Sequence, residues 1–178
     1  MNELQNKTGL IQVYTGPGKG KTTASLGLAM RALGHGWTVV MIQFMKDNPR
    51  YGEYLFSLRT DRFRILQSGQ SSFVKKGSPS QEDLRLAGEG MEKAAAVMAG
   101  GETDMLILDE INVAVNYGLV REQDLLAFIE QKPPALELVL TGRYASEKVI
   151  KHADLVSEVR ECKHPYRDGT EARQGIEY

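Results

Sequence analysis

The chain has 178 residues and a formal net charge of −1, a length that fits one domain, residues 1–178, with a substantial core. This charge balance disfavours nucleic acid or an anionic membrane as a partner, and three histidines with one cysteine are too few for a multi-thiolate zinc site. One cysteine, no apolar leader and no apolar run of membrane-spanning length together predict a cytoplasmic protein.

The first predicted element is a buried strand at 10–14, followed by a glycine-rich loop and a helix-compatible run. Glycines allow successive backbone N–H groups to face one anion, and the helix N-terminus adds its positive dipole end. Together with Gly-Lys-Thr at 20–22, this order predicts a phosphate-binding loop rather than a plain glycine-rich turn. The pattern departs from the usual one at Thr15, where a glycine is expected. The residues expected to bind the nucleotide are Gly16, Pro17, Gly18, Lys19, Gly20, Lys21, Thr22 and Thr23.

Periodicity and breakers predict alternating strands and helices along the rest of the chain. Ser80 resembles an N-cap, and the methionine and alanine stripe that follows it is interpreted as core packing. The segments 45–53 and 162–169 are predicted to be irregular. The expected strands are 10–14, 37–44, 63–66, 105–110, 137–141 and 155–159, and the expected helices are 24–33, 81–100, 113–117, 123–131 and 147–152. The fold predicted is a three-layer α/β phosphate-loop NTPase (RecA-like) domain with a mainly parallel sheet of about six strands.

The strand at 105–110 ends in two acids, Asp109 and Glu110. Carboxylates at the end of a strand can hold Mg²⁺ directly or through its waters, and the hydroxyl of Thr22 suits the same ion. Behind a phosphate loop this interpretation outweighs that of a strand ending in solvated acids. The predicted metal ligands are therefore Thr22 with Asp109 or Glu110, and the choice between the two acids stays open. Glu110 could instead orient a water molecule or an acceptor for phosphoryl transfer.

The chain resembles the P-loop type corrinoid adenosyltransferases (ATP:cob(I)alamin or cob(I)yrinic acid a,c-diamide adenosyltransferases). The resemblance covers nearly the whole chain, with its blocks in the family's order. These blocks are Tyr-Thr-Gly-Pro-Gly-Lys-Gly-Lys-Thr-Thr at 14–23, Ala-Leu-Gly-His-Gly at 32–36, Gln-Phe at 43–44 with Gly-Glu at 52–53, Leu-Asp-Glu at 108–110, Leu-Thr-Gly-Arg at 140–143, Ala-Asp-Leu-Val at 153–156, Lys-His-Pro-Tyr at 163–166 and Ala-Arg-Gln-Gly-Ile-Glu-Tyr at 172–178.

This resemblance implies a transferase in which the Co(I) of a reduced corrinoid, cobalamin or a precursor, attacks C5′ of ATP and triphosphate leaves. Because cobalt is the nucleophile, the protein needs no general base. It has to bind the leaving triphosphate with Mg²⁺, position C5′ and exclude water. Lys21, Thr22 and Glu110 are the residues expected to carry catalysis. The family is commonly dimeric, and a flavoprotein reductase is a possible partner.

Further site residues follow from positions in the matching blocks. Arg143 is expected either to pair with a phosphate or to form a surface salt bridge, and Lys163 and His164 are candidates to contact nucleotide or corrinoid. Ribose or corrin side chains could reach Gln43 and Glu53. Where the family often has Gly-Phe-Thr-Trp, with aromatic side chains against the lower face of the corrin, this chain has residues 69–74 with Phe73 as the sole aromatic side chain. The resemblance therefore implies that Phe73 contacts the corrinoid.

Two other function classes compete with the adenosyltransferase. One is an ATPase or small-molecule kinase that uses Glu110 and yields ADP. The other is a nucleotide-binding regulatory module without turnover, whose ATP binding would not respond to any corrinoid.

Overall fold

The sheet is the centre of the structure, a computed structural model that describes residues 8–70 and 74–178. Its six strands are all parallel and lie in the order β3-β2-β4-β5-β1-β6. The six predicted strands are all present, so the α/β prediction is confirmed, with a sheet that is wholly rather than mainly parallel. Their bounds are β1 Ile11–Thr15, β2 Val39–Phe44, β3 Phe63–Ser68, β4 Met105–Asp109, β5 Glu137–Thr141 and β6 Leu155–Glu158.

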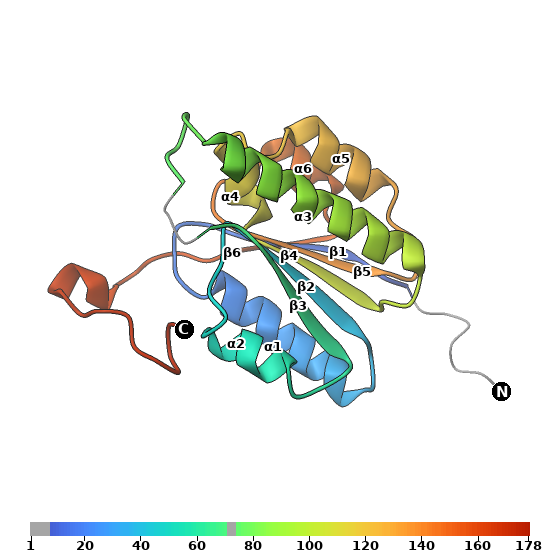
Figure 1. The fold of residues 1–178 in the computed structure, drawn as a ribbon, viewed down its shortest axis with the longest axis horizontal. Coiled ribbons are helices and arrows are strands. Elements are labelled where there is room, and N and C mark those ends of the chain that lie inside the picture. The colour runs from blue at the N-terminus through green and yellow to red at the C-terminus, as the bar shows by residue number, and fades with distance from the viewer. Residues whose placement is uncertain (1–7, 71–73) are drawn as a thin grey trace.

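Helices cover both faces of the sheet, with α1 and α2 on one face and α3, α4, α5 and α6 on the other (Figure 1). Their bounds are α1 Lys21–Gly34, α2 Gly52–Ser57, α3 Gln81–Gly100, α4 Ile111–Asn116, α5 Glu122–Glu130 and α6 Glu147–His152, and a 3₁₀ turn spans Pro165–Asp168. The sequence analysis did not predict α2 or the 3₁₀ turn. Both are too short to show helical periodicity. Within the described residues, no helix combines the length and the apolar character needed to cross a membrane.

Alternation along the strands divides the core into two layers. Val39 and Met41 of β2 pack toward α1, whereas Val40, Ile42 and Phe44 pack toward α3. The same alternation occurs in β4 and β5. Since successive side chains point to opposite faces, a strand buried on both faces is mostly apolar, as these three are apart from polar residues at or near their ends. The two core layers hold the sheet between the helices. They thereby also hold in place the carboxyl edge of the sheet, where β1, β2, β4 and β5 end.

Ser80 caps α3 as predicted. Its hydroxyl accepts from the backbone N–H of Asp83 at 3.1 Å, and the Asp83 carboxylate accepts from the backbone N–H of Ser80 at 2.9 Å. We expect Ser80→Ala to lower the free energy of unfolding by about 1 kcal/mol, because it leaves a first-turn N–H of the helix without its acceptor. Urea denaturation measures this change. Exposed Ser78 nearby provides the control, and equal destabilisation by Ser78→Ala would contradict the assignment of the cap.

Candidate nucleotide site

The predicted phosphate loop connects the end of β1 to the first residue of α1. Gly16 has φ +97°, and a Cβ added there would lie 2.5 Å from the carbonyl oxygen of Val159, just beyond β6. Gly18 is equally crowded by this strand's continuation, and its N–H donates to the carbonyl of Val159 at 2.8 Å. Thr15, which departs from the usual pattern, ends β1 with its hydroxyl accepting from the N–H of Ala145 at 3.2 Å. The loop is thus shaped by close backbone approach on its β6 side.

We expect Gly16→Ala to strain the loop and cost about 1–3 kcal/mol of stability together with nucleotide affinity, because neither the positive φ nor the space suits a Cβ. Gly27 within α1 is the matched control, since a Cβ there meets nothing within 4 Å. Gly27→Ala should leave stability unchanged or raise it by about 0.5–1 kcal/mol. Thermal melting and ATP titration measure both variants. Normal ATP affinity in Gly16→Ala would contradict this view of the loop.

Lys21 opens α1 and is buried against the loop. Its Nζ donates to the carbonyl oxygens of Gly16 at 2.9 Å and Gly18 at 2.5 Å. Burial lowers the pKa of Lys21, and the charge of nearby Glu110 works against that shift. A partly desolvated ammonium at the N-terminus of a helix is a suitable partner for a phosphate.

Asp109 is the centre of a hydrogen-bonded group at the end of β4. Its Oδ1 accepts from the hydroxyls of Thr22 at 2.9 Å and Thr141 at 2.7 Å. Its Oδ2 lies 2.6 Å from the Nζ of Lys46, and the Asp109 side chain is fully buried. Both carboxylate oxygens therefore have partners from other elements of the fold.

Glu110 adopts the left-handed conformation at φ 62° and precedes α4. Its N–H donates to the hydroxyl of Thr141 at 2.9 Å, while its carboxylate has no hydrogen-bond partner among the residues the structure describes. Burial and then the neighbouring charge of Asp109 raise the pKa of Glu110. This non-glycine backbone conformation turns the carboxylate toward a cavity, which marks it as a candidate ligand.

That cavity has a volume of 680 Å³ and extends from the phosphate loop along α1 toward α2. Leu26, Met30 and Leu33 of α1 and Phe56 of α2 supply apolar lining, suited to a base or sugar. The polar end contains Lys19, Lys21, Thr22, Thr23, Lys46, Glu53, Glu110 and Arg143. Cations and loop glycines at one end with apolar side chains at the other fit a nucleotide.

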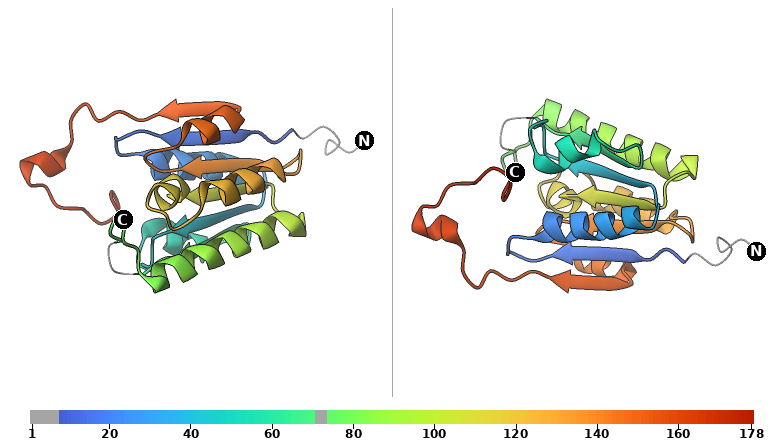
Figure 2. Two further views of the ribbon diagram at one scale, coloured as in Figure 1. Left: turned by 90° about the horizontal axis from the view of Figure 1, so that it is seen from above. Right: turned by 90° about the horizontal axis from the view of Figure 1, so that it is seen from below.

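The C-terminal segment closes one side of this cavity. It runs away from the sheet after β6 and then returns, so that the C-terminus lies close to α1 and α2 (Figures 1 and 2). Gly175, Ile176, Glu177 and Tyr178 line the cavity, and Glu177 lies 3.3 Å from the Nζ of Lys19 in the phosphate loop. Hydrogen bonds from Arg173 lower the pKa of Glu177 to about 2, which keeps this carboxylate charged at neutral pH.

The other predicted site residues lie at different depths. Glu53, Arg143 and His164 line the cavity. Gln43 is completely buried beneath it, where it donates to Glu53 at 3.0 Å and accepts from Gln67 at 3.0 Å. Lys163 is exposed and lies outside the described cavity lining.

Four of the predicted site residues, Arg143, Gly16, Pro17 and Phe73, differ from the rest in their surroundings or lie beyond the described residues. Arg143 has no ion pair among the described residues, so the alternative of a surface salt bridge is not seen there. Gly16 and Pro17 line a separate hollow of 380 Å³ on the β6 side of the loop. Phe73 lies outside the described residues.

Sequence reasoning missed Lys46, Tyr51 and the C-terminal residues as parts of the site. Lys46 and Tyr51 lie in the segment predicted to be a loop at the carboxyl end of β2. Because ligands bind at this edge of an α/β sheet, the position of the loop could have indicated that its residues belong to the site. The closing block at 172–178 was noticed for its resemblance, but nothing in its composition indicated a return to the phosphate loop.

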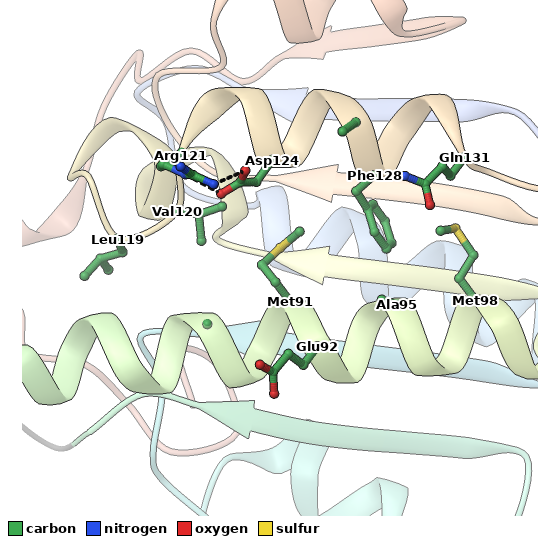
Figure 3. A pocket seen from close by; sticks show the side chains of 12 residues that line it. Met91, Glu92, Ala95, Met98, Leu119, Val120, Arg121, Asp124, Phe128 and Gln131 are labelled. Atoms are coloured by element: carbon green, nitrogen blue, oxygen red, sulfur yellow. Dashed lines mark hydrogen bonds and ion pairs between the residues drawn. The ribbon is translucent and has the colours of Figure 1, made fainter.

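A separate hollow of 570 Å³ lies between α3 and α5 (Figure 3). Met91, Met98 and Phe128 give it apolar walls, and the charged pair Arg121 and Asp124 is joined at 2.7 Å. The predicted stripe on α3 is partly core: Ala87 is buried, whereas Ala95 is exposed and borders this hollow. No group of polar side chains converges there as at the phosphate loop.

A parallel α/β sheet with a phosphate loop after β1 and an acid pair at the end of β4 defines a P-loop nucleotide-binding protein. Among known families, the one described as ATP:corrinoid adenosyltransferase BtuR/CobO/CobP matches residues 7–178, and the chain belongs to this family.

Several relatives named corrinoid adenosyltransferase are similar to the chain over most of their length. The protein from Sinorhizobium sp. is 36% identical, with 97% of this chain and 82% of the relative covered. The protein from Escherichia coli (strain K12) is 33% identical, over 99% and 89%. The protein from Pseudomonas aeruginosa is 31% identical, over 99% and 87%.

Proposed function

We propose that this protein transfers the 5′-deoxyadenosyl group of ATP to the Co(I) of a reduced corrinoid and releases triphosphate. The observation that carries the proposal is the phosphate loop, with Lys21 and Thr22 in place, in a chain that matches the adenosyltransferase family over residues 7–178. Phosphoryl transfer by an ATPase or kinase is not favoured, because the relatives named above are adenosyltransferases.

The residues around Thr22 fit Mg²⁺. The described residues contain no cluster of three or more acidic, histidine or cysteine ligands. P-loop sites need none, because Mg²⁺ is held there by the loop hydroxyl, one or two acids and the phosphates. Asp109 already accepts from Thr22 and pairs with Lys46, so Glu110, with its free carboxylate, is our choice for the direct ligand. Bound Mg²⁺ would neutralise charge on the triphosphate.

In the reaction, an electron pair of Co(I) forms the bond to C5′, and the bond from C5′ to the phosphate oxygen breaks with its electrons passing to the triphosphate. Cobalt is formally oxidised from Co(I) to Co(III), and no base has to remove a proton. Lys21, the loop N–H groups and Arg143 bind the leaving group, while the apolar lining of α1 and α2 positions the adenosyl moiety.

Membership of the family does not fix the corrinoid, the reductase, the assembly or the location of this protein. Either complete cobalamin or a precursor such as cobyrinic acid a,c-diamide could be the corrinoid. A flavoprotein reductase as the source of electrons, a homodimeric assembly and a cytoplasmic location stay predictions.

The test is anaerobic incubation of the protein with Mg-ATP and chemically reduced cobalamin, followed by absorption spectroscopy. We expect a light-sensitive adenosyl-cobalt spectrum that requires protein, ATP and corrinoid together. The same assay with reduced cobyrinic acid a,c-diamide compares the two corrinoids. Absence of the spectrum with both corrinoids would contradict the proposal.

A further inference from the structure

Lys46 is held in an unusual position by the backbone on either side of it. The preceding residue, Met45, has φ 57°, a conformation rare for a long side chain, and its N–H donates to the carbonyl of Ser68 at 3.1 Å. A Cβ on Gly69 would lie 2.4 Å from the backbone nitrogen of Lys46, so the end of β3 presses against this turn. The turn therefore carries Lys46 across the sheet edge from β2 to β4.

The ammonium of Lys46 is largely buried among acidic groups. Its side chain is 19% exposed, and its Nζ lies 2.6 Å from Asp109 and 5.9 Å from the centre of the Tyr51 ring. Burial by itself would lower the pKa of Lys46, but the charges of Asp109, Glu110 and Glu53 outweigh it and raise this pKa. Lys46 is thus a fixed positive charge at the carboxyl edge of the sheet.

Lys46 also lies where two cavities meet. The nucleotide cavity of 680 Å³ and a neighbouring cavity of 560 Å³ share three lining residues, Lys46, Tyr51 and Glu110. The rest of the second lining is largely apolar or neutral: Phe44, Met45, Asn48, Gln70, Val74, Val113 and Tyr117, with Asp47 as the remaining charge. If one substrate occupies each cavity, their reacting atoms must meet beside these three shared residues.

We propose that Lys46 contacts the phosphate oxygen that separates from C5′ and stabilises the charge that develops there, an inference that rests on the proposed function. In the reaction this oxygen changes from an ester oxygen to a full anion as the bond between cobalt and C5′ forms. A preorganised cation at the position of developing charge lowers the barrier without further reorganisation. Lys46 then exchanges part of its contact with Asp109 for the leaving oxygen.

The other cations of the site are placed differently. Lys19 pairs with Glu177, and Lys21 is bound to the loop carbonyls of Gly16 and Gly18. Neither they nor Arg143 line the second cavity, in whose described lining Lys46 is the one cation. Lys19, Lys21 and Arg143 are suited to bind the phosphates within the loop. Lys46 is suited to bind the phosphate that lies where the two cavities meet.

The experiment compares Lys46→Met with the wild type in binding of Mg-ATP and of inorganic Mg-triphosphate, using calorimetry without corrinoid. Triphosphate carries the extra charge that the ester oxygen of ATP lacks. We therefore expect triphosphate affinity to fall at least about 10-fold and ATP affinity less than about 3-fold, with kcat about 100-fold lower and KM for ATP little changed. Lys46→Arg should restore part of kcat. Lys148→Met, which removes an exposed lysine on α6, is the control for charge and should match the wild type.

Equal loss of affinity for the two ligands would overturn the inference, because it would mean that Lys46 only holds Asp109. Since Lys46→Met leaves a buried carboxylate without its cation, a second comparison sets Lys46→Met/Asp109→Asn against Asp109→Asn alone. The selective loss of triphosphate should persist there, and its absence would overturn the inference as well. Neither binding arm uses corrinoid, so failure of the proposed function, seen as no adenosyl-cobalt spectrum from the wild type, is a separate result.

Discussion

Lys21→Ala is expected to lower kcat/KM for ATP in adenosyl transfer by about 100–1000-fold. Lys21 is 5% exposed, and its ammonium is bound by the carbonyls of Gly16 and Gly18, which hold it within the loop. Alanine cannot reach a phosphate from this position, and no other cation among the described residues occupies the interior of the loop. Steady-state kinetics and calorimetric ATP titration measure the effect.

Two controls separate this effect from a general loss of charge or of folding. Lys151→Ala removes an exposed lysine in the last turn of α6 and should leave kcat/KM unchanged. Circular dichroism should show native helix and strand content in both variants. Wild-type turnover by Lys21→Ala would refute the assignment of the phosphate loop.

Glu110→Gln is expected to remove the dependence of ATP affinity on Mg²⁺ and to lower kcat by about 100-fold or more. Glutamine keeps the size of the side chain but not its charge. It leaves untouched the backbone bond from residue 110 to Thr141 and the hydrogen bonds of Asp109. ATP titrations over a range of Mg²⁺ concentrations measure the change directly.

Glu122→Gln is the matched control, because it removes one carboxylate from α5, where Glu122 pairs with Lys148. We expect its Mg²⁺ dependence to equal that of the wild type. If Glu110→Gln retained the normal Mg²⁺ dependence while Asp109→Asn lost it, Asp109 would be the direct ligand instead.

The sequence was sufficient to predict the sheet and to bring the loop at 15–22 and the acids at 109–110 to the same edge of it. The apolar runs of β2, β4 and β5 are buried on both faces, and their content of β-branched and other large apolar residues is typical of strands. The positions of Lys21, Thr22 and the two acids at the end of β4 could be predicted because each stands at a fixed offset from the end of a strand. Their roles as phosphate and metal ligands stay predictions.

The position of Lys46 could not be predicted in this way, because it depends on tertiary structure. Its contact with Asp109 requires β2 and β4 to be neighbours, Met45 to adopt a positive φ, and Gly69 to leave room for the turn. The contact between Lys19 and Glu177 likewise requires a tail without strand or α-helix to fold back on the loop. The six residues of α2 carry too little periodicity for a sequence pattern to show.

Single-turnover incubation with Mg-ATP and reduced corrinoid, analysed by phosphorus NMR, tests the central claim most directly. In this account, the phosphate loop binds triphosphate as the leaving group and does not transfer the γ-phosphoryl group. All three phosphates should therefore appear together as inorganic triphosphate, at the same rate as the adenosyl-cobalt product. ADP and orthophosphate formed without corrinoid would contradict the account and show that this site breaks the bond between the β- and γ-phosphates.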